Sequence, residues 1–196
     1  FGATVTENAV SITGYNVDAA SKNLTLAVSG NEIVFTYTKV NYTVEVDKNI
    51  ENGTVEVSKD SGNHNDEITV TVTPDEGYVI GKVTVNGTEI TAEDGVYKFE
   101  LTANTTVSAT FTARTDISYT VRYEDAQGNK LADDKVVTDQ TFGATVTENA
   151  VSITGYNVDV ASKNLTLAVS GNEIVFTYTK IDYTVTVDEN IENGTV

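Results

Sequence analysis

The stretch Tyr119-Thr120-Val121-Arg122-Tyr123 alternates large apolar or aromatic residues with polar or small ones. A period of two residues is typical of a strand with one buried and one exposed face. The same alternation appears in Tyr42-Thr43-Val44-Glu45-Val46 and returns in Tyr183-Thr184-Val185-Thr186-Val187. We therefore expect each stretch to open a module that is built mainly from strands.

Outside these stretches the chain repeats itself. Residues 1–55 recur as 142–196, at an offset of 141 residues, and the two copies differ at only five positions. The differing pairs are Ala19/Val160, Val40/Ile181, Asn41/Asp182, Glu45/Thr186 and Lys48/Glu189. Near-identity at so long a period indicates a recent duplication of whole domains rather than a solenoid. We expect the chain to begin and end in mid-unit, and the native protein to continue in both directions.

Each 141-residue unit consists of two modules. One spans about 117–180 and the other about 41–113, and Arg114-Thr115-Asp116 is the short polar join between them. Residues 1–39 correspond to the C-terminal part of the first module, and 182–196 to the start of the second. No Pro- or Ser-rich linker separates the modules, so we expect neighbouring domains to abut with little hinge freedom.

The expected fold class is mainly β, as a β-rich α+β array of small domains. In the 117–180 module the pattern predicts strands at 118–124, 135–139, 156–160, 164–169 and 173–179. One or two helical turns are expected at Ala144–Ile153, with Thr147 as the N-cap. In the 41–113 module we expect strands at 42–47, 53–58, 67–73, 78–85, 95–101 and 106–112. Asn86-Gly87 predicts a type I′ hairpin turn, and Pro74 is expected in a turn outside any strand.

Composition excludes several classes of function. The 196 residues carry a formal charge of −17 and no cysteine, methionine or tryptophan. Such a charge would repel nucleic acid, and the lack of cysteine removes disulfides, thiol catalysis and thiolate metal sites. The apolar runs are too short to cross a membrane. Thr and Val supply 32 and 29 residues, a composition that favours strands.

No residue pattern predicts catalysis or a cofactor. The single histidine, His64, lies in the polar stretch Lys59–Asp66, where we expect it to be solvated and without metal-ligating partners. Adjacent carboxylates recur beside expected turns, where solvation is the default: Asp66/Glu67, Asp75/Glu76, Glu93/Asp94, Glu124/Asp125 and Asp133/Asp134. Calcium is the one cation that the sequence leaves open, at Glu124–Asn129, although this run lacks the distal Glu of a calcium loop.

Several short phrases resemble known families. Residues Tyr119–Asp125, Gly128-Asn129-Lys130-Leu131, Gly143–Val146, Gly155-Tyr156 and Phe176–Thr179 resemble, in that order, a mucin-binding-protein (MucBP) repeat. The 41–113 module resembles the divergent internalin-type B repeat through Gly53-Thr54-Val55, Val70–Tyr78, Val83–Gly87 and Thr106–Phe111. The stretch Lys59–Asp66 is long for that family. The resemblance implies β-grasp-like folds, an extracellular position on a Gram-positive-type surface and a role in adhesion, with no catalytic residues.

These observations predict a repeat region of a bacterial surface adhesin or fibre that acts as a stalk in an elongated array. Two alternatives stay open. In one, the MucBP-like module is a lectin-like binder of mucin or other glycans, with ligand-binding residues that the sequence does not assign. In the other, the chain is a subunit that associates with copies of itself into filaments. An enzyme is not expected.

Overall fold

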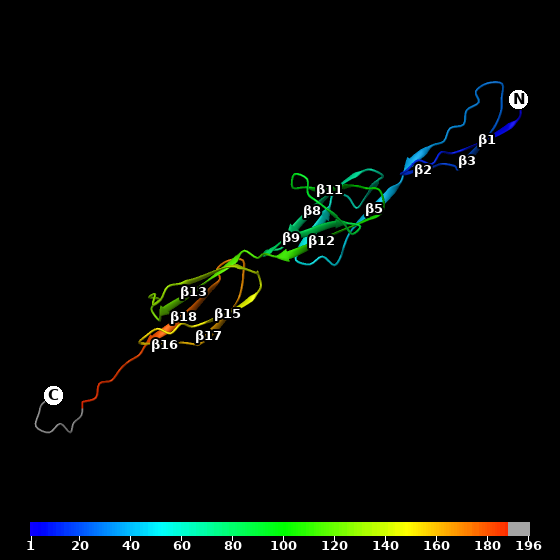
Figure 1. The fold of residues 1–196 in the computed structure, drawn as a ribbon. Coiled ribbons are helices and arrows are strands. Elements are labelled where there is room, and N and C mark those ends of the chain that lie inside the picture. Colours follow the sequence, from blue (N-terminus) through cyan, green and yellow to red (C-terminus); the bar gives the residue numbers. More distant parts are fainter. Residues whose placement is uncertain (188–196) are drawn as a thin grey trace, which may run out of the picture. The chain divides into compact units, whose positions relative to one another are not determined.

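The computed structural model describes residues 1–187, and its regular elements are all strands (Figure 1). Because this part of the chain contains no helix, it also contains none that could cross a membrane. The mainly-β fold class is therefore confirmed. The chain divides into two compact units, Phe1–Thr112 and Ala113–Val196, and we describe each by itself.

The first unit holds twelve strands. They are β1 (Thr4–Asn8), β2 (Tyr15–Val17), β3 (Ser21–Thr25), β4 (Tyr37–Lys39), β5 (Asn41–Val46), β6 (Gly53–Val57), β7 (Ser61–Asn63), β8 (Glu67–Pro74), β9 (Tyr78–Val85), β10 (Thr88–Ile90), β11 (Tyr97–Glu100) and β12 (Thr105–Ala113). The last eight form two sheets, with strand orders β10-β9-β12-β5-β7 and β11-β8-β6. Strands β5 and β12 are parallel in the first sheet, whereas β8 pairs antiparallel with both of its neighbours in the second.

The core of these eight strands lies between the two sheets. Val44, Val83 and Val107 come from the five-stranded sheet, and Ile68 and Val70 from the three-stranded sheet. All five are at most 3% exposed, and they share one cluster with Leu101 and Ala109. The alternation of apolar and polar residues along β5, β8 and β12 thus places one face of each strand in a common core.

The second unit begins with β13 (Ile117–Asp125) and contains β14 (Lys135–Gln140), β15 (Thr145–Asn149), β16 (Tyr156–Val158), β17 (Ser162–Thr166) and β18 (Glu173–Lys180). Four of these form a sheet of order β14-β13-β18-β16, and β15 and β17 form a separate antiparallel ribbon. The central pair β13–β18 is parallel, from Thr120 opposite Glu173 to Asp125 opposite Tyr178. The sheet mixes parallel and antiparallel pairs, and within residues 113–187 no helix packs against it.

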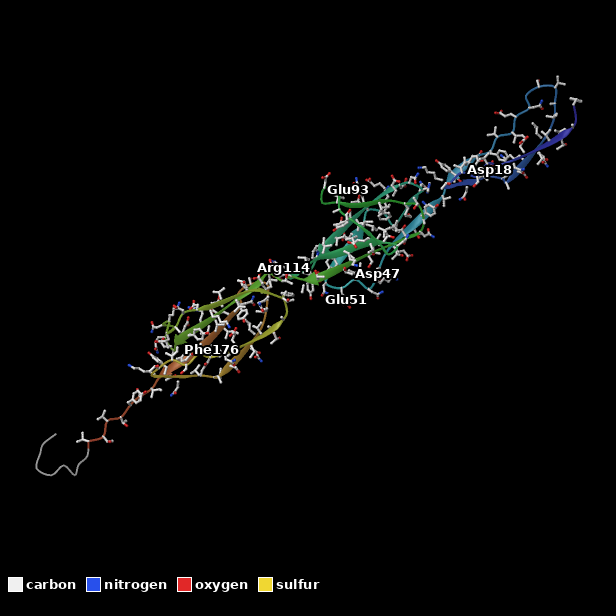
Figure 2. The ribbon with its side chains drawn as sticks, viewed as in Figure 1. Asp18, Asp47, Glu51, Glu93, Arg114 and Phe176 are labelled. Atoms are coloured by element: carbon white, nitrogen blue, oxygen red, sulfur yellow. The ribbon has the colours of Figure 1, made fainter. Side chains whose placement is uncertain are left out.

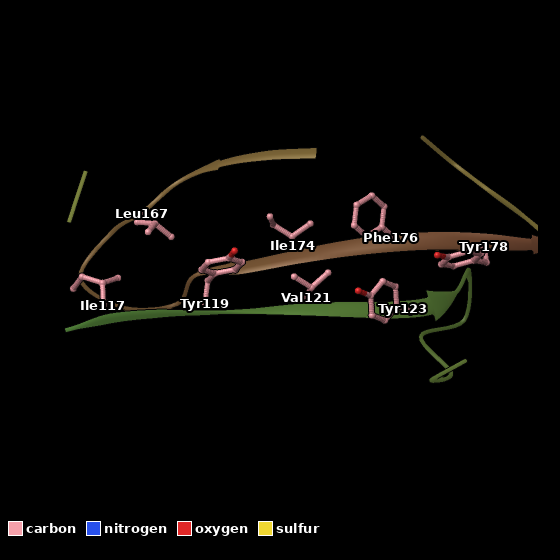
Figure 3. Close-up of a cluster of buried hydrophobic side chains, with 8 residues drawn as sticks. All are labelled: Ile117, Tyr119, Val121, Tyr123, Leu167, Ile174, Phe176 and Tyr178. Atoms are coloured by element: carbon pink, nitrogen blue, oxygen red, sulfur yellow. The ribbon is translucent and has the colours of Figure 1, made fainter. Parts of the chain in front are cut away.

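The core of the second unit follows the central strand pair (Figure 3). Side chains from β13 and β18 alternate along it, and Leu167 closes one end. Tyr123 and Phe176 stack with ring centroids 6.0 Å apart and planes 8° from parallel. Phe176 is fully buried among the strands of this unit (Figure 2).

The two copies of the repeated sequence differ in how much of their core is covered. In the copy at 142–180, β18 has eight residues, and it pairs with β13 along most of its length. In the copy at 1–39, the strand shrinks to β4, which pairs only with β2, and residues 32–36 have no strand. Phe35 and Tyr37 are accordingly half-buried, whereas Phe176 and Tyr178 are buried. Strand length here depends on a neighbouring strand rather than on the local sequence.

Some sequence expectations are wrong in detail. The helical turns expected at Ala144–Ile153 are absent, because Thr145–Asn149 forms β15 and pairs with β17. Thr147 does not cap a helix but donates a hydrogen bond to Asn164 Oδ1 across this ribbon, at 2.8 Å. Pro74 is not outside the strands: it ends β8, opposite Gly53, at a position where the ladder stops. The short strand β7 was not predicted.

The hairpin expected at Asn86-Gly87 is confirmed. Both residues have positive φ, 49° and 79°, as a type I′ turn requires, and β9 and β10 flank them as an antiparallel pair. The predicted start of another domain at 182–196 lies partly outside the described residues. Residues 182–187 are described, and they form no strand.

Candidate functional site

A groove lies in the second unit where the loop after β15 meets β16 and β18. The loop residues 150–153, Tyr156, Val158 and Tyr178 give it walls of mixed apolar and polar character, and Asn157 adds an amide. Its volume is about 320 Å³, at the lower limit of volumes typical of small-molecule sites. A groove of this size suits one or two sugar rings rather than a large ligand.

The same groove occurs in the N-terminal copy. It is lined by residues 9–12, Tyr15, Val17, Ala20 and Tyr37, each of which lies 141 positions before a residue of the first groove. Its volume is about 210 Å³. Because residues 1–39 have no counterpart of β13 and β14, the groove does not depend on that pair of strands. It is a local property of the repeated sequence.

Tyrosine hydroxyl groups hold the loop of each groove in place. Tyr178 donates a hydrogen bond to the Val151 carbonyl at 2.6 Å, and Tyr37 donates the equivalent bond to Val10 at 2.7 Å. Burial raises the pKa of Tyr178 above its ordinary value, so this hydroxyl stays a donor at neutral pH. Gly155 completes the loop with φ of +82°, a conformation that favours glycine. The groove is therefore preformed.

The chemistry of the groove is that of a binding surface. Tyr156 is half-buried, so part of its ring remains accessible, and Ser152 and Asn157 are exposed beside it. An accessible aromatic face with hydroxyl and amide groups beside it can stack against a sugar ring and bond its hydroxyls. No histidine, lysine or carboxylate is among the residues that line the groove.

A second polar feature, inside the second unit, surrounds the Glu148 carboxylate. Glu148 is 8% exposed and accepts hydrogen bonds from Tyr119 Oη at 2.6 Å and from Lys135 Nζ at 2.7 and 2.8 Å. The bonds from Lys135 and then from Tyr119 lower the pKa of Glu148, although burial opposes them. The bond to Glu148 and burial raise the pKa of Tyr119 to about 12. Both shifts favour a fixed Glu148 carboxylate and neutral Tyr119 at neutral pH, so the cluster fastens β14 and β15 to the core.

The carboxylate pairs singled out in the sequence do not assemble into a site. Across residues 1–187 no group of three or more His, Cys, Asp or Glu side chains is placed to hold a metal ion. At the calcium candidate Glu124–Asn129, Asp125 accepts hydrogen bonds from the backbone N–H of Gln127 and Asn129, and from the Asn129 amide. The Asn129 bonds lower the pKa of Asp125. These oxygen atoms stabilise the turn itself.

His64 is not solvated, in contrast to the expectation from its polar surroundings. It is 9% exposed, and its ring lies edge-on to Tyr42 with centroids 6.1 Å apart. The ring also lies against Gly14, which is distant in the sequence and carries no side chain to signal the contact. The stretch Lys59–Asp66 is long for the resembled family, and this departure was the only sequence signal that the histidine has a particular role.

Comparison with protein families decides what these modules are similar to. Residues 119–179 match the MucBP domain. Residues 42–115 match the divergent InlB B-repeat domain, so both predicted modules are found at the expected places. No curated protein and no solved structure matches the chain. The MucBP and InlB B-repeat domains are surface repeat or binding domains, which indicates a repeat region of a bacterial surface or adhesion protein.

The groove was missed by sequence reasoning. Tyr156 and Tyr178 were assigned to strands, where aromatic residues normally pack across the sheet. That holds for Tyr178, which is buried, but only in part for Tyr156, which packs against the core and stays half-buried. The glycine of the phrase Gly155-Tyr156, which has positive φ, is the sequence signal for the turn that precedes Tyr156.

Proposed function

We propose that this chain is part of the stalk of a bacterial surface adhesin, outside the cell. The observation that carries the proposal is the recurrence of a two-module unit at 141 residues with only five changes in 55 positions. A binding site is useful as a single copy, whereas repetition of whole domains adds length. The recurrence therefore favours a part whose selected property is reach.

The short joins between modules support a stalk. One residue, Val40, separates β4 from β5, and three residues separate β12 from β13. In the three-residue join, the Arg114 guanidinium forms two hydrogen bonds to the Asp116 carboxylate, at 2.9 and 2.7 Å. Joins this short leave little slack for one module to fold back against the next. The charge of −17 adds repulsion between neighbouring copies on a crowded surface.

Electron microscopy of proteins with one and two 141-residue units tests the stalk. Compact modules of 64 to 73 residues have diameters near 30 Å, so each unit should lengthen the particle by roughly 60–80 Å. A particle that grows in width rather than in length would contradict the proposal. The same images test the alternative in which copies associate into filaments, because only that alternative gives particles longer than a single chain.

A second function is favoured by the groove that both copies form. We propose that it binds one or two sugar residues of a mucin-type or other glycan, with Tyr156 and Tyr15 as the stacking side chains. NMR titration of the full chain with mucin-type oligosaccharides should shift the amides around both grooves. Tyr156→Ala should remove the response of the groove around Tyr178 alone, and Tyr15→Ala should remove that of the groove around Tyr37. A spectrum unchanged at millimolar saccharide would leave the chain as a spacer only.

A further inference from the structure

We propose that residues 61–66, hereafter the clamp loop, fasten the B-repeat-like module to the MucBP-like sequence before it, with Gly14 as the docking point and His64 as the inserted side chain. This interaction surface is separate from the proposed stalk and groove functions. The contact does not depend on whether the chain binds a ligand. The first unit extends over residues 1–112, so the join at Val40 lies inside one compact unit.

Both backbone groups of Val40 are used at the join. Its N–H donates to the Gly14 carbonyl at 2.8 Å, and its carbonyl accepts the N–H of His64 at 2.9 Å. One peptide segment thus contacts the MucBP-like sequence on one side and the clamp loop on the other. Pairing of Asn41 with Asn63, between β5 and β7, brings His64 to this position.

The His64 ring occupies the space where any other residue at position 14 would place its Cβ. An ideal Cβ built on Gly14 would lie 1.8 Å from His64 Cδ2 and 2.1 Å from its Cγ. Real Cβ contacts essentially never fall below 3.0 Å, so only glycine admits the ring. Gly14 also has φ of +76°. Two independent constraints, the backbone conformation and the contact with His64, therefore require glycine here.

The clamp loop is itself fixed to the core of its module. The N–H of Asn65 donates to the Leu101 carbonyl and the N–H of Leu101 donates to the Asp66 carbonyl, both at 2.9 Å. Asp66 also accepts a hydrogen bond from the Asn63 N–H at 2.9 Å, which closes the turn. Leu101 is fully buried. His64 is thus presented on a rigid support, so any motion at the join must displace its ring from Gly14.

The docking surface recurs in the second copy. Ile181 donates its N–H to the Gly155 carbonyl at 2.8 Å, as Val40 does to Gly14. Gly155 has φ of +82°, yet a Cβ there would meet nothing within 4 Å. The same surface is therefore formed in both copies.

Distance measurements by electron paramagnetic resonance on the full chain test the clamp. The chain has no cysteine, so Ser21→Cys on β3 and Glu89→Cys on β10 give one spin label on each side of the join, both at exposed positions. We expect a narrow distance distribution in the otherwise unaltered protein. His64→Ala should broaden it by about twofold or more, because modules without a fixed contact move by default.

Substitutions at glycine separate the contact from backbone strain. Gly14→Ala should broaden the distribution as His64→Ala does. Gly30→Ala is the matched control, since Gly30 lies in the same copy with φ of +74° and has nothing within 4 Å of its Cβ position. It should leave the distribution narrow. The double variant of Gly14 and His64 should be no broader than His64→Ala alone, because removal of the ring makes room for the new methyl group.

Two results would overturn the clamp. One is a distribution that is already broad in the unaltered pair. The other is a distribution that stays as narrow with His64→Ala and Gly14→Ala as with Gly30→Ala. Neither result depends on the length of the particle or on glycan binding, so failure of the clamp is distinguishable from failure of the stalk.

Discussion

Replacement of Glu148 by Gln tests how the second unit holds β14 and β15 to its core. The carboxylate accepts three hydrogen bonds, from Tyr119 and Lys135, and Gln offers a single oxygen and an amide that faces these donors. A hydrogen bond to a charged group contributes about 1.5–3 kcal/mol to stability. Lys135 is 52% exposed, so solvent screens its share, and we expect a total loss of about 2 kcal/mol. For a unit of this size the melting temperature should fall by about 10 °C.

The repeat supplies a matched control for this experiment. Glu7 is the counterpart of Glu148 in the N-terminal copy, and it is exposed because nothing there corresponds to Tyr119 or Lys135. In scanning calorimetry of the full chain, Glu148→Gln should lower the transition of the second unit. Glu7→Gln should leave both transitions in place.

The pH dependence follows from the direction of the shift. The bonds from Lys135 and Tyr119 hold the pKa of Glu148 below its ordinary value of 4.5. The carboxylate therefore stabilises the folded unit fully above pH 4.5, and this contribution is lost as the pH falls through the lower, folded pKa. The difference in melting temperature between the unaltered protein and Glu148→Gln should shrink below about pH 4.5. Two results would refute this reasoning. One is an equal loss of melting temperature in Glu148→Gln and Glu7→Gln. The other is a difference in melting temperature between Glu148→Gln and the unaltered protein that does not change with pH.

Three further predictions concern the cores and their edges. Phe176→Ala should lower the free energy of unfolding, measured by denaturant titration, by about 3–5 kcal/mol. Phe35→Ala should lower it clearly less, because only Phe176 is fully buried. Equal losses would contradict the difference in core burial between the two copies. A synthetic peptide of residues 114–141 should bind the full chain and shift the NMR signals of residues 32–36, because β13 of that segment pairs with β18 in the near-identical copy. Signals that do not move would show that residues 32–36 do not offer an unpaired strand edge. Between pH 10 and 12 the stability of the second unit should fall by about 2–3 kcal/mol as the unfolded chain loses the Tyr119 proton that the folded unit keeps. Tyr119→Phe should abolish this part of the loss, and an unchanged alkaline profile would count against the buried bond to Glu148.

Alternating residues were enough to predict most of the sheet. The β13 sequence carries an apolar or aromatic side chain at every second position, and the structure buries Ile117, Tyr119, Val121 and Tyr123 on one face. The turn at Asn86-Gly87 was predictable because few residues tolerate positive φ twice in succession. Periodicity and turn chemistry are local properties, so the sequence displays them directly.

The segment 144–153 shows where local reasoning failed. A threonine followed by a glutamate can begin a helix, but Thr145–Asn149 instead pairs with Ser162–Thr166. The β-branched residues of this segment favour a strand once a partner is present. The partner lies across a connection that contains β16, and no local pattern reveals the pairing.

Contacts between distant residues were equally hidden. A polar loop predicted a solvated His64, but burial of that ring depends on Gly14, a residue recognisable only by its lack of a side chain. Glu148 looked like one exposed acid among many until the fold placed Tyr119 and Lys135 beside it. In each case the local sequence does not show which distant segment packs against the residue. Comparison of the two copies supplies part of that information, because nearly the same sequence has different neighbours in each copy.

Small-angle X-ray scattering of this chain in solution tests the central claim most directly. A single compact globule of 196 residues would have a radius of gyration of about 16 Å. Modules of 39, 73 and 64 residues joined end to end, with centres roughly 30–35 Å apart, would have a radius of about 26 Å. The stalk predicts the larger value, unchanged between dilute and concentrated samples. A value near 16 Å would contradict it.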